Sequence, residues 1–330
     1  MRLFKTVTFL LGVGLLYWMI QRLGVQALLN GFERLGWGFV PVLLLGLVTF
    51  LLYTLSWSLF LKRFGDRPIS FWSLFQIKVA GEAGNTLTPL NFVGGDPARV
   101  WFLSQKMPIE VSGASVVVDR TVQTLAVVAV IVLGDLAALF KLTLPLLANA
   151  ILGATSFLLV AFVLLFLFYQ TRGCFQKILR LLSWLKLHRF KPTSMDRAIE
   201  MDRTLALFYQ KAKGLFFISF FLHFISRLMG VLEILVLARY LDVPMGGWEA
   251  LFFAAVIPVT NLLGTFIPGT LGLLEGVVSS LFLSLHWNPA DGLVLQMARR
   301  LRSFFWIILG FLFILFFRIN RQREMRPSNG

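Results

Sequence analysis

Long runs of apolar residues alternate with short polar segments along almost the whole chain. Residues 35–61, 142–171 and 250–274 contain no charged side chain. A helix needs about 20 predominantly apolar residues to cross the hydrocarbon core of a bilayer, and each of these windows reaches that length. The pattern therefore predicts an all-α polytopic membrane protein and excludes a water-soluble fold.

The same criterion predicts about six full spans in the whole chain. The first has a basic start, at Arg2 and Lys5, followed by apolar residues, as a secretory signal peptide does. No small-residue cleavage site follows before Gln21 and Arg22, so we interpret this segment as a retained helix. The predicted spans are residues 3–20, 38–61, 113–140, 145–169, 214–239 and 293–317.

Composition narrows the class further. Only 14% of the 330 residues are charged and the mean hydropathy is +0.80, whereas about a quarter of the residues in a soluble domain are charged. Cys174 is the only cysteine, which excludes a disulfide framework and a thiolate metal cluster. The three histidines are scattered, so the sequence predicts no metal site and no cofactor.

The net charge of +15 comes largely from basic residues that flank the apolar spans. These residues gather in three places, at residues 62–67, 172–213 and 318–326. The positive-inside rule places such clusters in the cytoplasm, and the same side chains attract anionic lipid headgroups. Nucleic-acid binding is the alternative for so basic a chain, but the topological explanation requires no nucleic-acid partner.

With these clusters in the cytoplasm, both termini are cytoplasmic and two segments begin and end on one side of the membrane. Residues 71–110 start and end inside, and residues 248–291 start and end outside. Each segment is predicted to dip into the bilayer and return, as a re-entrant hairpin or as two full crossings, and the parity of the spans does not decide between these. Residues 172–213 are predicted to form a cytoplasmic loop, with helices at 177–186 and 195–213.

The two dipping segments also resemble each other in sequence. A shift of 179 positions pairs Pro89 with Pro268, Asp96 with Glu275, and Arg120 with Arg299. Because the charge distribution gives the two halves opposite orientations, we predict an inverted-topology repeat, which is common in secondary transporters. The halves are residues 38–140 and 214–317 of a single domain covering residues 1–330.

Helix-breaking residues mark the middle of each dip. In the first dip, Pro89, Gly94 and Gly95 interrupt a helix, and Asp96-Pro97 is predicted to be an N-cap followed by proline at the first helical position. The positive end and free N–H groups of that helix would suit an anion such as phosphate. The alternative is a kinked core helix whose glycines permit close packing. The corresponding residues of the second dip are Asn261, Gly264, Pro268, Gly269, Gly272 and Glu275.

Charged residues also occur within the predicted spans, where each costs roughly 2.5–3.5 kcal/mol at the bilayer centre. A wet cavity is favoured for Arg120, Arg227 and Glu275. Snorkelling to the interface is favoured for Arg239 and Arg302. An internal ion pair is the alternative explanation. His223 lies on the helical face of Arg227 and is interpreted as a hydrogen-bonded packing residue. The charged residues concerned are Asp119, Arg120, Arg227, Glu233, Arg299, Arg300 and Arg302.

These motifs resemble the lysylphosphatidylglycerol synthase/flippase transmembrane family over nearly the whole chain. The resemblance implies a protein of the bacterial plasma (inner) membrane with a flippase-like domain that handles lipids. Because no soluble catalytic domain follows the last span, aminoacyl transfer to lipid is not expected. The resemblance also implies that Gly95, Asp96, Arg99, Arg120 and Glu275 line the headgroup path. The motifs are Asn85…Pro89…Gly94-Gly95-Asp96…Arg99, Val117-Val-Asp119-Arg120 and Pro268-Gly269…Gly272…Glu275.

Together these features predict a lipid transporter that binds an anionic or polyprenyl-linked headgroup in an arginine-lined intramembrane cavity. Arg99, Arg120 and Arg299 would neutralise the phosphate, with Asp96 and Glu275 pairing the arginines when the site is empty. Gly94-Gly95 lacks the lysine and spacing of a P-loop, so no nucleotide is predicted. The predicted headgroup-binding residues are Asn85, Gly94, Gly95, Asp96, Arg99, Asp119, Arg120, Arg227, Asn261, Gly269, Glu275, Arg299 and Arg300.

Two other functions remain open from the sequence. A membrane-embedded transferase or phosphatase could use Asp96, Asp119 and Glu275 as acid, base or metal ligands. No closely spaced aspartate pair and no serine–histidine arrangement supports that reading, so no catalytic residue is predicted. The third possibility is a noncatalytic partner in lipid, glycolipid or hopanoid synthesis. The sequence identifies neither the lipid nor the oligomeric state.

Overall fold

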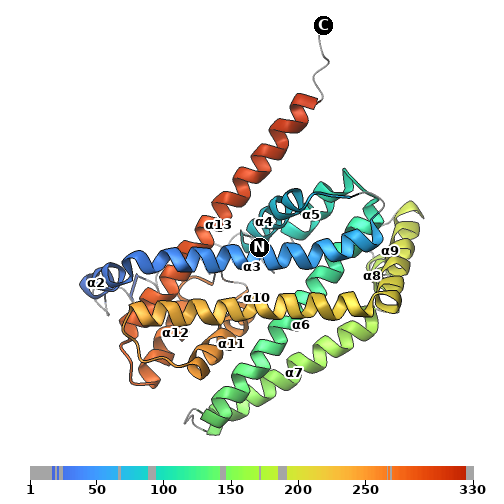
Figure 1. Cartoon of the computed structure of the whole chain (residues 1–330). Coiled ribbons are helices and arrows are strands. Elements are labelled where there is room, and N and C mark those ends of the chain that lie inside the picture. Colours follow the sequence, from blue (N-terminus) through green and yellow to red (C-terminus); the bar gives the residue numbers. More distant parts are fainter. Residues whose placement is uncertain are drawn as a thin grey trace.

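The computed structural model describes residues 17–18, 21, 25–65, 68–87, 94–141, 146–170, 172–184, 192–265, 267 and 270–324. The regular elements in these residues are all helical, which confirms the predicted all-α membrane fold (Figure 1). The predicted first span lies almost entirely outside the described residues. Five helical segments are long and apolar enough to cross a membrane: Val25–Phe64, Ile109–Lys141, Ala150–Gln170, Lys213–Tyr240 and Pro289–Phe317.

These segments agree closely with the other five predicted spans. A short helix α2 and the 3-10 turn η1 lead into α3, so the chain reaches the second predicted span through an amphipathic segment. The last helix, α13, continues beyond the predicted end of its span. The bounds are α2 Val25–Leu35, η1 Gly36–Gly38, α3 Phe39–Phe64, α6 Ile109–Lys141, α7 Leu146–Gln170, α10 Lys213–Tyr240 and α13 Pro289–Glu324.

Each predicted dip contains two short helices. The first dip holds α4 (Phe71–Leu87) and α5 (Gly95–Ser104), and the second holds α11 (Gly247–Leu263) and α12 (Leu273–Ser284). With a rise of about 1.5 Å per residue, α5 and α12 are roughly 15 and 18 Å long, about half of a hydrocarbon core. Neither can cross the bilayer, so these lengths favour hairpins that enter and leave on one side.

The loop between the two halves is helical, as predicted. It contains α8 (Cys174–Trp184) and α9 (Pro192–Lys211), which pack against each other. The Asp202 carboxylate on α9 accepts hydrogen bonds from the backbone N–H groups of Phe175 and Gln176, both at 3.0 Å. A carboxylate at a helix N-terminus satisfies unpaired N–H groups and complements the helix dipole. Asp202 therefore fixes α8 onto α9.

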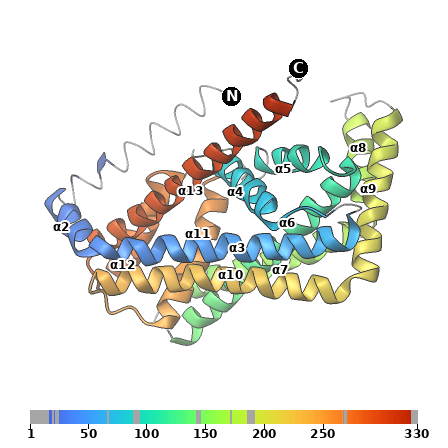
Figure 2. The same ribbon diagram turned by 45° about the horizontal axis from the view of Figure 1, so that its top comes forward.

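The two halves share an order of elements and pack reciprocally. Each half has a long helix, two short helices and a second long helix, and α3 runs along α10 (Figures 1 and 2). The short helix α4 packs on α13 of the other half, while α11 packs on α6. Gly134 of α6 lies against the backbone of α11 at Leu251, and Gly310 of α13 lies against the backbone of α4 at Val79. Because a short helix of each half packs on the last long helix of the other, the contacts support a structural repeat. The opposite orientation of the two halves stays a prediction.

Two large apolar clusters lie mainly in the first and in the second half, and each includes residues from beyond its own half. In the first half, Trp57 and Phe60 of α3 are buried against α6 and α9. In the second half, Phe253 of α11 packs with Phe282 of α12 and Trp287, at ring-centroid distances of 5.4 and 6.3 Å. Within a bilayer, close van der Waals packing of such side chains, rather than their removal from water, stabilises helix association. These cores hold the short helices in place, so that their N-terminal ends have fixed positions inside the protein.

Candidate functional site

Asp119 lies at the centre of a buried charge network in the first half. Its side chain, on α6, is fully buried. One carboxylate oxygen, Oδ2, is 2.5 Å from Lys78 Nζ of α4 and 2.6 Å from Arg99 Nη2 of α5. The other oxygen, Oδ1, is 3.2 Å from His223 Nε2 of α10. A single carboxylate thus joins four helices, and its two cationic partners are themselves buried.

A second carboxylate, Asp96 in the first turn of α5, binds Arg120 through two parallel contacts. Arg120 Nε donates to Asp96 Oδ2 at 2.9 Å, and Arg120 Nη2 donates to Oδ1 at 2.8 Å. The remaining guanidinium nitrogen, Nη1, donates to Gln123 at 2.9 Å. Glu82 lies 3.5 Å from Arg120 and 3.6 Å from Lys78. Bidentate arginine–carboxylate geometry is the strongest form of ion pair, so Asp96 holds Arg120 in one orientation.

Asn85, at the end of α4, occupies the N-terminus of α5. Its Oδ1 accepts the backbone N–H groups of Gly95 at 2.8 Å and Asp96 at 3.2 Å, and its Nδ2 donates to Asp96 Oδ1 at 3.0 Å. The N-cap position is Gly94, so the predicted N-cap role of Asp96 is wrong: Asp96 lies inside the first helical turn. The expectation of free N–H groups fails for these two residues, because the Asn85 amide already satisfies them.

Close backbone contact between α4 and α5 explains the glycines of this segment. A Cβ atom at Gly95 would overlap the carbonyl oxygen of Gly81 and approach the Asn85 side chain at 2.7 Å. A Cβ atom at Gly81 would in turn overlap the aliphatic part of Arg99. Glycine therefore allows the two helices to lie close enough for the Asn85 contacts to form.

Aromatic rings of α3 cover the buried cations. The Arg99 guanidinium carbon lies 4.2 Å from the centroid of the Trp57 ring. Tyr53 has Lys78 Nζ at 5.1 Å and the Arg227 guanidinium at 5.8 Å, and it stacks on His223 at 4.9 Å. Cations within about 6 Å of a ring face are attracted by its quadrupole. Tyr53 thus connects the network around Asp119 with Arg227.

The second half holds a corresponding ion pair at the N-terminus of α12. Glu275 is fully buried and accepts the backbone N–H of Gly272 at 2.9 Å, forming a capping contact. Arg300 of α13 binds Glu275 through Nε and through Nη2, the latter at 2.9 Å, and also donates to the Thr270 carbonyl at 3.2 Å. The Thr270 hydroxyl donates to Asn261 at 2.9 Å. Arg300, rather than the predicted Arg299, is therefore the structural counterpart of Arg120.

Arg299 instead belongs to a separate cluster with Glu233 of α10. Glu233, whose side chain is 1% exposed, lies 3.2 Å from Arg299 Nε and 2.6 Å from Arg302 Nη1. The prediction that Arg302 snorkels to the interface is wrong, because its guanidinium turns inward to this carboxylate. The pairing of Glu275 with Arg299 that the sequence suggested is also absent, since Glu275 binds Arg300.

The structure thus brings the predicted residues together in three groups. The first group contains Asn85, Gly94, Gly95, Asp96, Arg99, Asp119 and Arg120; the second contains Asn261, Glu275 and Arg300; and Arg299 joins the Glu233 cluster. Arg227 lies beside Tyr53, and Gly269 falls outside the described residues.

Sequence reasoning missed several members of these groups. Lys78 and Glu82 are one helical turn apart inside a segment predicted to lie in the membrane, and intramembrane charges are functional candidates by default. That signal could have found both residues. Asp135 of α6 was also missed; it is buried and contacts Ser156 of α7 at 2.5 Å. No comparable signal marks Tyr53, because aromatic residues are common throughout the spans.

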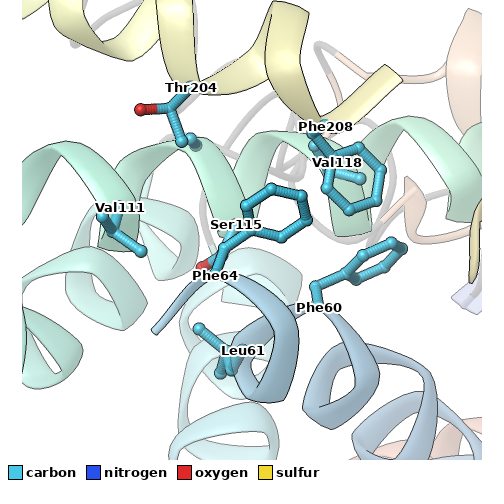
Figure 3. Close-up of a pocket in the computed structure, with 9 residues that line it drawn as sticks. Phe60, Leu61, Phe64, Val111, Ser115, Val118, Thr204 and Phe208 are labelled. Atoms are coloured by element: carbon cyan, nitrogen blue, oxygen red, sulfur yellow. The ribbon is translucent and has the colours of Figure 1, made fainter. Parts of the chain in front are cut away.

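Two hollows among the described residues have linings without a charged side chain. One, of about 20 Å³, lies between α3, α6 and α9 and has room for about one water molecule (Figure 3). The other is an open groove of about 450 Å³ along α12. The arginine-lined cavity therefore stays a prediction. The small cavity is lined by Phe60, Leu61, Phe64, Val111, Ala114, Ser115, Val118, Thr204 and Phe208, and the groove by Leu273, Gly276, Val277, Ser280, Leu281 and Ser284.

Long apolar helices, short paired helices and buried ion pairs define a multi-pass α-helical membrane protein. The family model of the lysylphosphatidylglycerol synthase TM region matches residues 6–310, so the chain belongs to this family. A UPF0104 membrane protein of Methanothermobacter thermautotrophicus is 26% identical over 278 residues, which cover 78% of each chain. No solved structure matches the chain.

Proposed function

We propose that this protein is a flippase-like transporter that moves an anionic or polyprenyl-linked lipid between leaflets. The observation that carries the proposal is the pair of partly buried arginine–carboxylate contacts, Asp96–Arg120 and Glu275–Arg300, each at the N-terminus of a helix too short to span. Charges inside a membrane protein are costly and mark substrate pathways. Membership of the lysylphosphatidylglycerol synthase TM region family supports a role in lipid handling.

In the proposed mechanism, a lipid phosphate competes with the carboxylates for the guanidinium groups. Arg120 is the best placed for this exchange in the first half, because its side chain is 26% exposed whereas those of Arg99 and Lys78 are fully buried. A phosphate can accept the same two parallel hydrogen bonds that Asp96 accepts. The headgroup would thus replace Asp96 as the partner of Arg120, while the acyl chains remain in the bilayer.

The carboxylates have a second role in this mechanism. An unpaired guanidinium in a low-dielectric interior is strongly destabilised, and Asp96 and Glu275 remove that cost when no lipid is bound. The site can then close without headgroup or water. Release of the lipid would be driven by re-formation of the same ion pairs, so that binding remains weak enough for turnover.

We expect Arg120→Ala and Glu275→Gln each to lower lipid exchange between leaflets by about 10- to 100-fold. That range corresponds to the roughly 1.5–3 kcal/mol of a hydrogen bond to a charged group. The measurement is dithionite quenching of a fluorescent phosphatidylglycerol in proteoliposomes that contain the purified chain. Arg239→Ala is the matched control, because Arg239 is an exposed arginine at the end of α10.

Thermal unfolding of each variant verifies that the exchange assay compares folded proteins. Exchange at the wild-type rate in both Arg120→Ala and Glu275→Gln would contradict the transport proposal. Exchange that is lost equally in Arg239→Ala would show that the assay responds to total charge rather than to the two arginine–carboxylate pairs.

A further inference from the structure

Within the described part of the chain, positive charge exceeds negative charge in one of the three ion-pair groups. Around Asp119, the three cations Lys78, Arg99 and Arg120 face three carboxylates, Glu82, Asp96 and Asp119.

The second group pairs Glu275 with Arg300 one to one. In the third group, Glu233 faces both Arg299 and Arg302. Among the described residues, this last cluster therefore carries a net charge of about +1 inside the protein.

The cluster also contains hydrogen-bond donors that have no acceptor in the described part of the chain. Arg299 Nη1 and Arg302 Nε are buried and without a partner. A buried donor left unsatisfied costs about 1–3 kcal/mol, and here two lie on neighbouring guanidinium groups. A second ligand with acceptor oxygens would satisfy them while Glu233 stays in place.

The arginines are the more exposed part of the cluster. The N-terminal part of α13 crosses the C-terminal part of α10 near α12, and the ion pairs join these two long helices (Figures 1 and 2). The side chains of Arg299 and Arg302 are 14% and 22% exposed, whereas Glu233 is 1% exposed. The arginines thus form the accessible side of the cluster, and the carboxylate lies behind them.

We infer that Arg299 and Arg302, backed by Glu233, form a subsite for a singly charged phosphodiester such as that of a phospholipid headgroup. The inference rests on the proposed transport function and names the chemistry of its ligand. A phosphodiester carries one negative charge, which matches the excess of the cluster, whereas a phosphomonoester carries about −1.5 to −2 at pH 7.

The charge balance predicts opposite effects for two substitutions in the same cluster. Arg302→Gln removes the excess positive charge and a free donor, so it is expected to weaken binding of dihexanoyl phosphatidylglycerol about tenfold. Glu233→Gln removes the competing carboxylate, so it is expected to leave this binding unchanged or to tighten it. The measurement is isothermal titration of the purified full chain in detergent, with Arg239→Gln as the control that keeps wild-type binding.

Comparison probes distinguish the possible sources of the anion. Dihexanoyl phosphatidylcholine contains the same phosphodiester together with a choline cation that the arginines repel, so it is expected to bind more weakly than phosphatidylglycerol. Inorganic phosphate, which is no diester, is expected to bind at least about tenfold more weakly. Phosphate binding as tight as that of phosphatidylglycerol would overturn the assignment of a lipid phosphodiester. If Arg302→Gln does not fold, Arg302→Lys keeps the charge but loses the planar fork, and an intermediate affinity is expected.

Equal weakening in Arg302→Gln and Glu233→Gln would overturn the inference, because it would mean that the cluster only joins α10 to α13. The test is separable from that of the proposed function. If the variants change phosphatidylglycerol binding as expected but the wild-type protein exchanges no lipid, the transport proposal is contradicted and the subsite is supported. If lipid exchange depends on Arg120 but phosphatidylglycerol binding is the same in Arg302→Gln and wild type, the subsite is contradicted and the transport proposal is not.

Discussion

Asp119→Ala is expected to lower the free energy of unfolding by about 3–5 kcal/mol, the cost of removing one partner from a buried ion pair. Asp119 is the shared acceptor of Lys78, Arg99 and His223, and both cations are fully buried. Without the carboxylate, two positive charges would face each other away from water. Chemical unfolding of the full chain in detergent micelles, followed by tryptophan fluorescence, measures the difference.

Two further variants isolate the cause of this loss. Asp196→Ala removes an exposed carboxylate from α9 and is expected to leave stability unchanged. Combining Asp119→Ala with Lys78→Met removes one cation together with its counter-ion, so part of the lost stability is expected to return. An Asp119→Ala protein as stable as the wild type would show that the network does not hold α4, α5, α6 and α10 together.

Gly95→Ala is expected to prevent accumulation of folded protein. The added Cβ atom would overlap the carbonyl oxygen of Gly81, which belongs to the backbone of α4 and cannot turn away as a side chain can. Separating α4 from α5 would also break the contacts of Asn85 with Gly95 and Asp96. Fluorescence-detected size-exclusion chromatography of a tagged full-length chain measures the folded fraction.

Gly153→Ala provides the matched control for this steric prediction. Gly153 lies in α7, and a Cβ atom there would meet no atom within 4 Å. Alanine is favoured over glycine by about 1 kcal/mol inside a helix, so this variant should fold at least as well as the wild type. Normal yield and stability of Gly95→Ala would contradict the close α4–α5 contact.

The sequence predicted the long helices well because a bilayer imposes one dominant rule on them. Residues 113–140 and 214–239 are predicted to be spans because each is long and apolar, and α6 and α10 match them with small differences at the ends. Length and hydropathy decide the existence of such helices whatever their neighbours are. The bounds of the short helices α5 and α12 are harder to predict from the sequence, because they depend on tertiary contacts such as that of Asn85 with Gly95.

The candidate site was predicted only in part, because ion pairing depends on which helices meet. The sequence grouped Asp96, Asp119 and Arg120 correctly by their common position in the first half. It assigned Arg302 to the interface from its place near a span end, whereas the packing of α13 on α10 turns it towards Glu233. A shift of 179 positions selected Arg299 as the counterpart of Arg120. The geometry selects the next residue, Arg300, because Arg300 and not Arg299 binds Glu275.

The reciprocal packing of α4 on α13 and of α11 on α6 makes the two halves interdependent. A fragment containing either half alone would expose the surface that normally receives the other half's hairpin, and would lack the backbone contact at Gly134 or Gly310. Each half thus contributes a hairpin that packs against the other half, and neither half is a separate module. A movement of the α4–α5 hairpin would therefore also displace α13, which packs against α4. Because α13 carries Arg300, a displacement near Asp96 and Arg120 would be coupled to the Glu275–Arg300 pair.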